Sequence, residues 1–195
     1  MPNWFYIAFI SPVLWAIVNH FDKYATMRFR NAQGIGGIIV ITSVVSVVMV
    51  PVALLFNSNV FDVPLSSRFI LICNGLMNTF AGLSYLYAIQ EDEASVVAPL
   101  FQLVPVFGYF LGYLLLGESL TERQIAGSVI ILLGSVFLLI DFSSTRKHSF
   151  KWRIGLLMVL SSLLYASFQV LFKVVTIKGS FWTSVFWEYT GIFIS

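Results

Sequence analysis

The sequence predicts an all-α integral membrane protein. Hydrophobic residues make up 58% of the 195 residues and charged residues only 10%, whereas a soluble domain carries about a quarter charged residues. The charges fall between long apolar runs, and these runs are continuous rather than alternating in polarity, which argues against a β-barrel. A chain with so few charges cannot cover a water-soluble core, so the lipid bilayer is its expected environment.

Each apolar run approaches the roughly 20 residues that a helix needs to cross a bilayer. Short polar loops separate the runs, so consecutive helices are expected to be antiparallel neighbours. The predicted spans are residues 4–21, 35–56, 69–89, 94–116, 124–140 and 154–175, followed by an incomplete seventh at 181–195. The seventh run has no polar flank after it, which predicts that the chain is the N-terminal part of a longer protein.

A modest internal repeat links the first span to the sixth. Ile7–Arg28 aligns without gaps to Leu157–Lys178, and polar positions match as well as apolar ones. The matched pairs include Trp15 with Tyr165, Asn19 with Gln169, and Lys23 with Lys173. The second copy begins five spans after the first, an odd offset, so it enters the membrane in the opposite direction. This pattern is typical of inverted-repeat transporters, in which two related halves surround a central site.

Residues 98–139, APLFQLVPVFGYFLGYLLLGESLTERQIAGSVIILLGSVFLL, resemble the end of an EamA domain of the drug/metabolite transporter superfamily. The early segment SPVLWAIVNHFDKY also resembles the first helix of that family. The resemblance rests on Pro99, Pro105, Gly117–Glu118, Leu120–Thr121, Gln124, Gly127 and Gly134. It implies a secondary transporter with ten helices in two inverted EamA units. The first unit would cover residues 1–143, a basic linker 144–153, and the start of the second unit 154–195.

Repeat and resemblance together predict a multi-pass transporter of the plasma or inner membrane that moves a small metabolite by alternating access. Family members often carry amino acids or their derivatives, and many are exporters. The expected partners are the bilayer and a small-molecule substrate, with no nucleic acid, cofactor or metal. The sequence has no Ser-His-Asp set, phosphate loop or metal-ligand spacing, which argues against an enzyme. The alternatives are a membrane-embedded enzyme and a non-transporting scaffold or sensor module.

Polar and aromatic residues within the spans are the candidates for substrate binding. Asn74 and Asn78 lie four positions apart and therefore share one helix face. The two repeat-related lysines would attract an anionic group such as a carboxylate; the alternative is that they snorkel to the headgroups. For the amides, the alternative is hydrogen bonding between helices. The predicted substrate-binding residues are Trp15, Asn19, Lys23, Asn74, Asn78, Gln102, Tyr165, Gln169 and Lys173.

Glu188 is the candidate for proton coupling. It lies about 12 Å into the seventh run at 1.5 Å per residue, and a short acidic side chain cannot easily snorkel from that depth. The alternative is that the true span begins later and leaves Glu188 nearer the membrane surface.

The fourth predicted span contains residues that weaken helices. Pro99 and Pro105 are expected to bend it and to free backbone carbonyls at a wet cavity. Gly108 and Gly112 form a small-residue face, and Gly127 and Gly134 on the fifth span offer a matching close approach. We therefore expect the first half of this span to line a cavity and the second half to form a packing seam.

Overall fold

The computed structural model of the protein describes residues 3–28, 32–91, 97, 99–138, 140–141, 149–150, 152–177 and 179–195. The helices are α1 (Asn3–Arg28), α2 (Ala32–Phe56), α3 (Leu65–Glu91), α5 (Leu103–Leu116), α6 (Glu122–Leu138), α7 (Trp152–Ile177) and α8 (Phe181–Ile194). Two short strands, β1 (Ile140–Asp141) and β2 (Ser149–Phe150), pair antiparallel between α6 and α7. The predicted all-α membrane class is confirmed.

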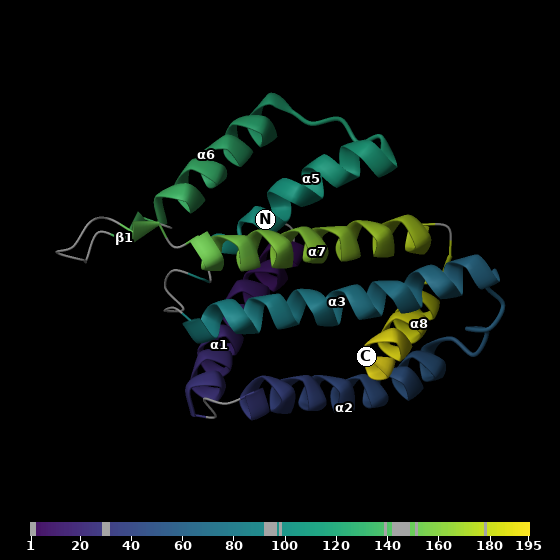
Figure 1. Ribbon diagram of the computed structural model, residues 1–195. Helices are drawn as coiled ribbons and strands as arrows, with labels where there is room; N and C mark the ends of the chain where they lie inside the picture. Colours follow the sequence, from purple (N-terminus) through teal and green to yellow (C-terminus); the bar gives the residue numbers. More distant parts are fainter. Residues whose placement is uncertain are drawn as a thin grey trace.

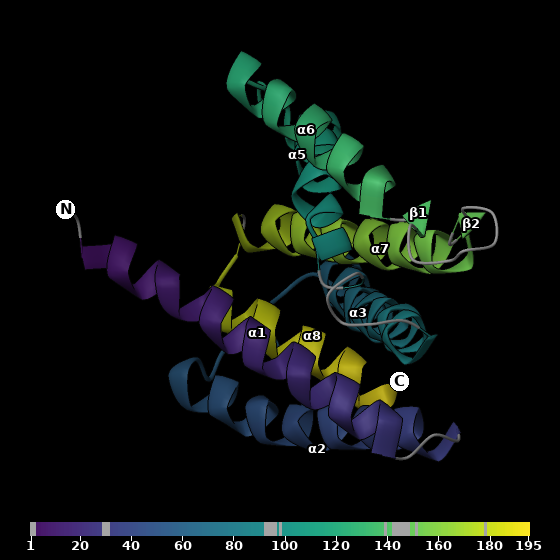
Figure 2. The same ribbon diagram turned by 90° about the vertical axis from the view of Figure 1, so that its left-hand side faces the viewer.

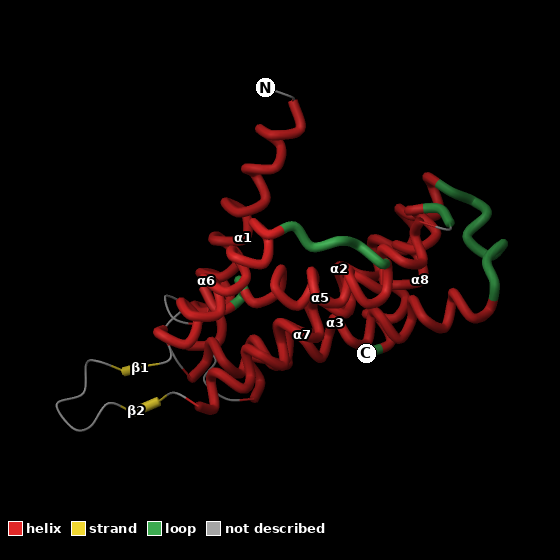
Figure 3. The backbone as a smooth tube through the Cα atoms, turned by 90° about the horizontal axis from the view of Figure 1, so that it is seen from above, coloured by secondary structure: helices red, strands yellow, loops and turns green. Residues whose placement is uncertain are grey.

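Helices α3 and α7 run side by side through the middle of the molecule (Figure 1). Helix α8 crosses between α3 and α2. Helices α5 and α6 form a hairpin on the side of α7 that faces away from α3 (Figure 2). The β1–β2 pair projects beyond the helices at one end (Figure 3). Within the described residues, Ile35–Phe56, α3 and α7 are long and apolar enough to cross a membrane.

Helices α1 and α7, which the predicted repeat relates, both contact the C-terminal end of α3. The C-terminal part of α1 and the N-terminal start of α7 both lie at the C-terminal end of α3. Lys23 of α1 reaches the Ile89 carbonyl there, and Arg153 of α7 forms an ion pair with Glu91 at 3.1 Å. Figure 3 shows that α1 crosses α3 and α7 steeply, so these contacts do not set α1 and α7 antiparallel along one axis, and the inverted repeat stays a prediction.

Two glycines allow α3 and α8 to cross in close contact. A Cβ at Gly75 would overlap the Glu188 carbonyl and lie 2.6 Å from the Ile192 nitrogen, and a Cβ at Gly191 would overlap the Ile72 carbonyl. Backbone therefore meets backbone on both sides of this crossing. Small residues permit such an approach, which increases van der Waals contact where lipid supplies no hydrophobic drive between helices.

The fourth predicted span is interrupted between its two prolines. Helix α5 begins only at Leu103, and Gln102 occupies its N-cap. Pro105 therefore lies in the first turn of α5, where its missing N–H would have had no partner inside the helix. The freed Phe101 carbonyl accepts a hydrogen bond from the Val104 N–H at 2.9 Å. The break replaces the bent, continuous helix over 94–116 that the sequence suggested, although residues 94–96 and 98 lie outside the described part.

The glycines expected to form a seam between the fourth and fifth spans have open space around them. A Cβ at Gly108, Gly127 or Gly134 would meet nothing within 4 Å in the described structure. At Gly112 it would approach a Glu118 side-chain oxygen at 3.0 Å, not helix α6. The expected seam is therefore absent from this part of the structure, and the tight glycine contact lies instead between α3 and α8. Glycine spacing alone does not identify the partner helix.

Candidate substrate cavity

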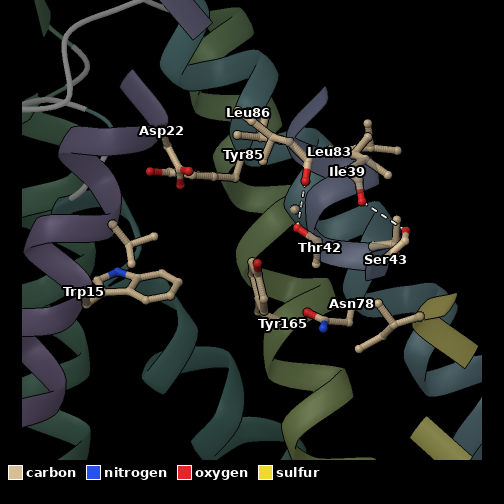
Figure 4. Close-up of a pocket in the computed structure, with 15 residues that line it drawn as sticks. Trp15, Asp22, Ile39, Thr42, Ser43, Asn78, Leu83, Tyr85, Leu86 and Tyr165 are labelled. Atoms are coloured by element: carbon tan, nitrogen blue, oxygen red, sulfur yellow. Dashed lines mark hydrogen bonds between the residues drawn. The ribbon is translucent and has the colours of Figure 1, made fainter. Parts of the chain in front are cut away.

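A cavity of about 200 Å³ lies between α1, α2, α3, α7 and α8 (Figure 4). It is small beside typical ligand pockets, which are about 300–1,000 Å³. Its polar and aromatic lining residues are Trp15, Asp22, Thr42, Ser43, Asn78, Thr79, Tyr85 and Tyr165. Helices α1 to α3 come from the first predicted unit, and α7 and α8 come from the second. Both proposed units therefore contribute to one cavity.

The break before α5 supplies the aromatic centre of this region. Phe101 is buried and contacts the rings of Trp15 at 5.5 Å, Tyr85 at 4.8 Å and Tyr165 at 5.5 Å between ring centroids. Ring pairs at these distances add to the energy of simple burial. Phe101 thus holds three cavity residues from three different helices in place.

Helix α1 is fastened to α3 by two polar contacts beside the cavity. The Tyr85 hydroxyl donates a buried hydrogen bond of 2.6 Å to Asn19 Oδ1. The Lys23 ammonium donates to the Ile89 carbonyl at 2.8 Å. Between these two positions along α1, the Asp22 carboxylate lies against Tyr85 and faces the cavity (Figure 4).

The hydroxyl groups of α2 present mainly acceptor atoms to the cavity. Thr42 donates its proton to the Ile38 carbonyl at 2.9 Å, and Ser43 donates to the Ile39 carbonyl at 3.0 Å. Each hydroxyl has a single proton to donate, so its oxygen keeps only lone pairs for a ligand. Together with the Asp22 carboxylate, these groups make the polar lining rich in acceptors.

A second, shallower groove lies between α5 and α7. It is lined by Gly108, Tyr109, Gly112, Glu118, Gln169 and Lys173, among others. An ion pair joins Lys173 to Glu118 here, and each side chain is half exposed. The two charged residues of the groove therefore pair with each other across it.

Residues 117–121, GESLT, form the turn between α5 and α6 beside the groove. Gly117 ends α5 in the left-handed conformation, with φ 66°, which glycine adopts without strain. Thr121 and Gln124 exchange hydrogen bonds at the start of α6, as in a capping box. The turn places Glu118 over Gly112 and toward Lys173. The Gly117–Glu118 pair thus has a structural explanation.

The structure divides the predicted substrate residues into separate places. Trp15, Asn78 and Tyr165 line the cavity, whereas Gln169 and Lys173 line the groove. Asn19 is buried in its bond to Tyr85. The remaining three lie outside both linings: Lys23 is bound to Ile89, Asn74 donates to the Phe168 carbonyl at 3.1 Å, and Gln102 is exposed at the N-cap of α5.

Sequence reasoning missed several residues of the cavity. Asp22, Thr42, Ser43 and Thr79 line the cavity but are not among the predicted substrate-binding residues. Asp22 did carry a signal, because an ionisable residue in a membrane helix is a functional candidate by default. The α2 hydroxyls carried none, since a serine or threonine in an apolar helix commonly bonds its own backbone.

Glu188 is buried in α8, 5% exposed. Within the described part of the chain its carboxylate has no hydrogen-bond or ion-pair partner, and its own carbonyl takes part in the Gly75 crossing. Ile192, one turn further along α8, lines the cavity. The acid therefore lies one turn away from the cavity wall, in the interface of α8 with α2 and α3.

Apolar helices around a cavity with few polar groups are typical of membrane transporters, and the comparisons with known proteins support this class. The model of the EamA-like transporter family matches residues 3–140. The chain belongs to the EamA-like transporter family.

Individual relatives are described only in general terms. The chain is similar to uncharacterized transporters of Archaeoglobus fulgidus (39% identity over 31% of this chain and 22% of the relative) and Clostridium kluyveri (31% identity over 44% and 27%). An uncharacterized protein of Methanocaldococcus jannaschii is 27% identical over 52% of this chain and 74% of the relative. The chain thus matches about a quarter of the length of the first two. No solved structure matches significantly.

Proposed function

We propose that the protein is a multi-pass secondary transporter of the plasma or inner membrane that exports a small metabolite by alternating access. The cavity between α1, α2, α3, α7 and α8 is the proposed substrate site. The observation that carries the proposal is that both predicted units line one cavity in a chain of a transporter family. Inverted-repeat transporters bind their substrates at the interface between the repeats.

The size and lining of the cavity support a substrate of roughly amino-acid size. Its volume is about 200 Å³. Aromatic rings of Trp15, Tyr85 and Tyr165 offer apolar contact, while Asn78 and the α2 hydroxyls offer hydrogen bonds (Figure 4). A mostly apolar wall with a few placed polar groups is the usual composition of a small-molecule site.

Flux measurements in proteoliposomes test this proposal. Vesicles that contain the protein and are loaded with a metabolite panel are expected to release at least one compound faster than protein-free vesicles loaded with the same panel. Asn78→Leu in the cavity is expected to lower that flux at least tenfold, while Gln169→Leu in the groove changes it less than twofold. Absence of flux for the whole panel would favour the scaffold or sensor alternative, and conversion of a panel compound would favour an enzyme.

Glu188 is the proposed coupling group. Its buried position, without a partner among the described residues, makes its charge state sensitive to events in the neighbouring cavity. Glu188→Gln is expected to abolish uptake driven by a proton gradient and to leave exchange of substrate across the membrane intact. Gradient-driven uptake that persists in Glu188→Gln vesicles would remove this residue from the coupling step.

A further inference from the structure

The charges around the cavity differ from those expected of a carboxylate-binding site. Among the described residues that line it, Asp22 is the ionisable acid, and none is a lysine or arginine. Lys23 points to the Ile89 carbonyl at the end of α3, and Lys173 forms an ion pair with Glu118 across the groove. Neither of the two lysines predicted to attract an anion reaches this lining.

The hydrogen-bonding groups lead to the same conclusion. Thr42 and Ser43 have given their protons to backbone carbonyls, and the Tyr85 hydroxyl has given its proton to Asn19. Asp22 is an acceptor when ionised. The Thr79 hydroxyl is paired with Ser195 at 2.7 Å. The other donors of the described lining are the uncharged groups of Trp15, Asn78 and Tyr165. The acceptor oxygens of this lining suit a ligand that brings N–H or O–H donors of its own.

The aromatic residues add a third feature that suits a cation. Trp15 and Tyr165 line the cavity with Asp22, and both rings pack against Phe101. Figure 4 shows Trp15 and Tyr165 below the Asp22–Tyr85 pair, around the same space. Aromatic faces attract an ammonium group through the ring quadrupole, and more strongly where water is excluded.

We infer that the cavity selects a small organic cation with a primary ammonium group on an apolar body, held by Asp22 and by the rings of Trp15 and Tyr165. This inference rests on the proposed function and names the substrate class of the same site. The carboxylate of an ordinary amino acid would find no cationic partner in the described lining. An amine without a carboxylate, or with its carboxylate masked, therefore fits better than a free amino acid.

Binding measurements on the protein in lipid nanodiscs test the inference independently of transport. The probes are phenethylammonium, its neutral analogue 2-phenylethanol, phenylalanine, and 3-phenylpropanoate, titrated by calorimetry at neutral pH. The expected affinity order is phenethylammonium, then phenylalanine, then 3-phenylpropanoate, with at least tenfold between the first and the last. Phenethylammonium that binds no more tightly than 3-phenylpropanoate, or does not bind, overturns the inference.

Variants connect the selectivity to Asp22. Asp22→Asn is expected to weaken phenethylammonium binding at least tenfold and 2-phenylethanol binding less than twofold. Asp62→Asn removes an equivalent carboxylate from the exposed α2–α3 loop and is expected to change neither. If Asp22→Asn does not fold, Trp15→Leu serves instead and should weaken the cation about fivefold relative to the alcohol. If the ratio of phenethylammonium affinity to 2-phenylethanol affinity is unchanged in the folded variant, the inference is overturned.

The outcomes separate this inference from the proposed function. Tight binding of 3-phenylpropanoate, together with metabolite flux that Asn78→Leu reduces, would keep the transporter and its cavity but reject the cationic substrate. Selective binding of phenethylammonium without flux of any compound would keep the cation site and reject the transport function.

Discussion

The repeat-related lysines Lys23 and Lys173 occupy equivalent positions in the sequence but have different partners in the structure. Lys23 donates to a backbone carbonyl of α3 beside the cavity, whereas Lys173 pairs with a carboxylate on the α5–α6 turn beside the groove. Around the cavity, α3 is held to α8 by direct backbone contact and to α1 by hydrogen bonds. Around the groove, α7 is held to the α5–α6 turn by a half-exposed ion pair. Two lysines that the predicted repeat pairs therefore make different contacts in the structure.

The largest effect is expected where α3 and α8 meet at the cavity region. Gly75→Leu forces a side chain into the Glu188 carbonyl and the Ile192 nitrogen, and overpacking against backbone is expected to cost about 3 kcal/mol or more. Gly108→Ala, in the open groove, should instead be neutral or stabilising by up to about 1 kcal/mol. Unfolding in mild detergent measures both. Equal losses of stability would show that the two regions are packed alike.

Removal of the first lysine is expected to have an intermediate effect. Lys23→Met deletes the charged donor to the Ile89 carbonyl, and a hydrogen bond with a charged partner contributes about 1.5–3 kcal/mol. The variant should unfold earlier than the wild type in the same detergent titration. Stability within error of the wild type would mean that this bond does not hold α1 against α3.

Removal of the second lysine is expected to have the smallest effect. The Lys173 and Glu118 side chains are each half exposed, and exposed ion pairs contribute about 0–1 kcal/mol. Lys173→Met, Glu118→Gln and the double variant form a cycle whose coupling free energy should not exceed about 1 kcal/mol. A larger coupling would place this pair among the main contacts of the fold and remove the contrast with Lys23.

Much of the fold could be predicted because helix formation in lipid depends on local composition. The runs now forming α2, α3 and α7 are apolar over lengths that cross a bilayer, and their polar flanks mark the ends. The break at Phe101–Gln102 was less predictable, because two prolines permit either a bend or an interruption. Whether the helix bends or breaks depends on the packing of Phe101 against neighbouring helices. That packing cannot be read from the sequence around the two prolines.

The candidate site was only partly predictable, for a physical reason. Trp15, Asn78 and Tyr165 were identified from residue type and repeat position, and they line the cavity. Asn74 was expected to share a face with Asn78 and to bind substrate. Its side chain is instead buried and donates a hydrogen bond to the Phe168 carbonyl of α7. Periodicity places a side chain on a helix face. Whether that face borders another helix or a cavity is determined by tertiary packing.

The central claim is that substrate occupies the cavity and not the groove, and cysteine protection tests it most directly. In a Cys73→Ser background, Thr42→Cys places a thiol in the cavity wall and Gly108→Cys places one in the groove. A transported substrate is expected to slow labelling by a small thiol reagent at position 42 and to leave position 108 unaffected. Protection at position 108 alone, or equal labelling rates with and without substrate at position 42, would contradict the account.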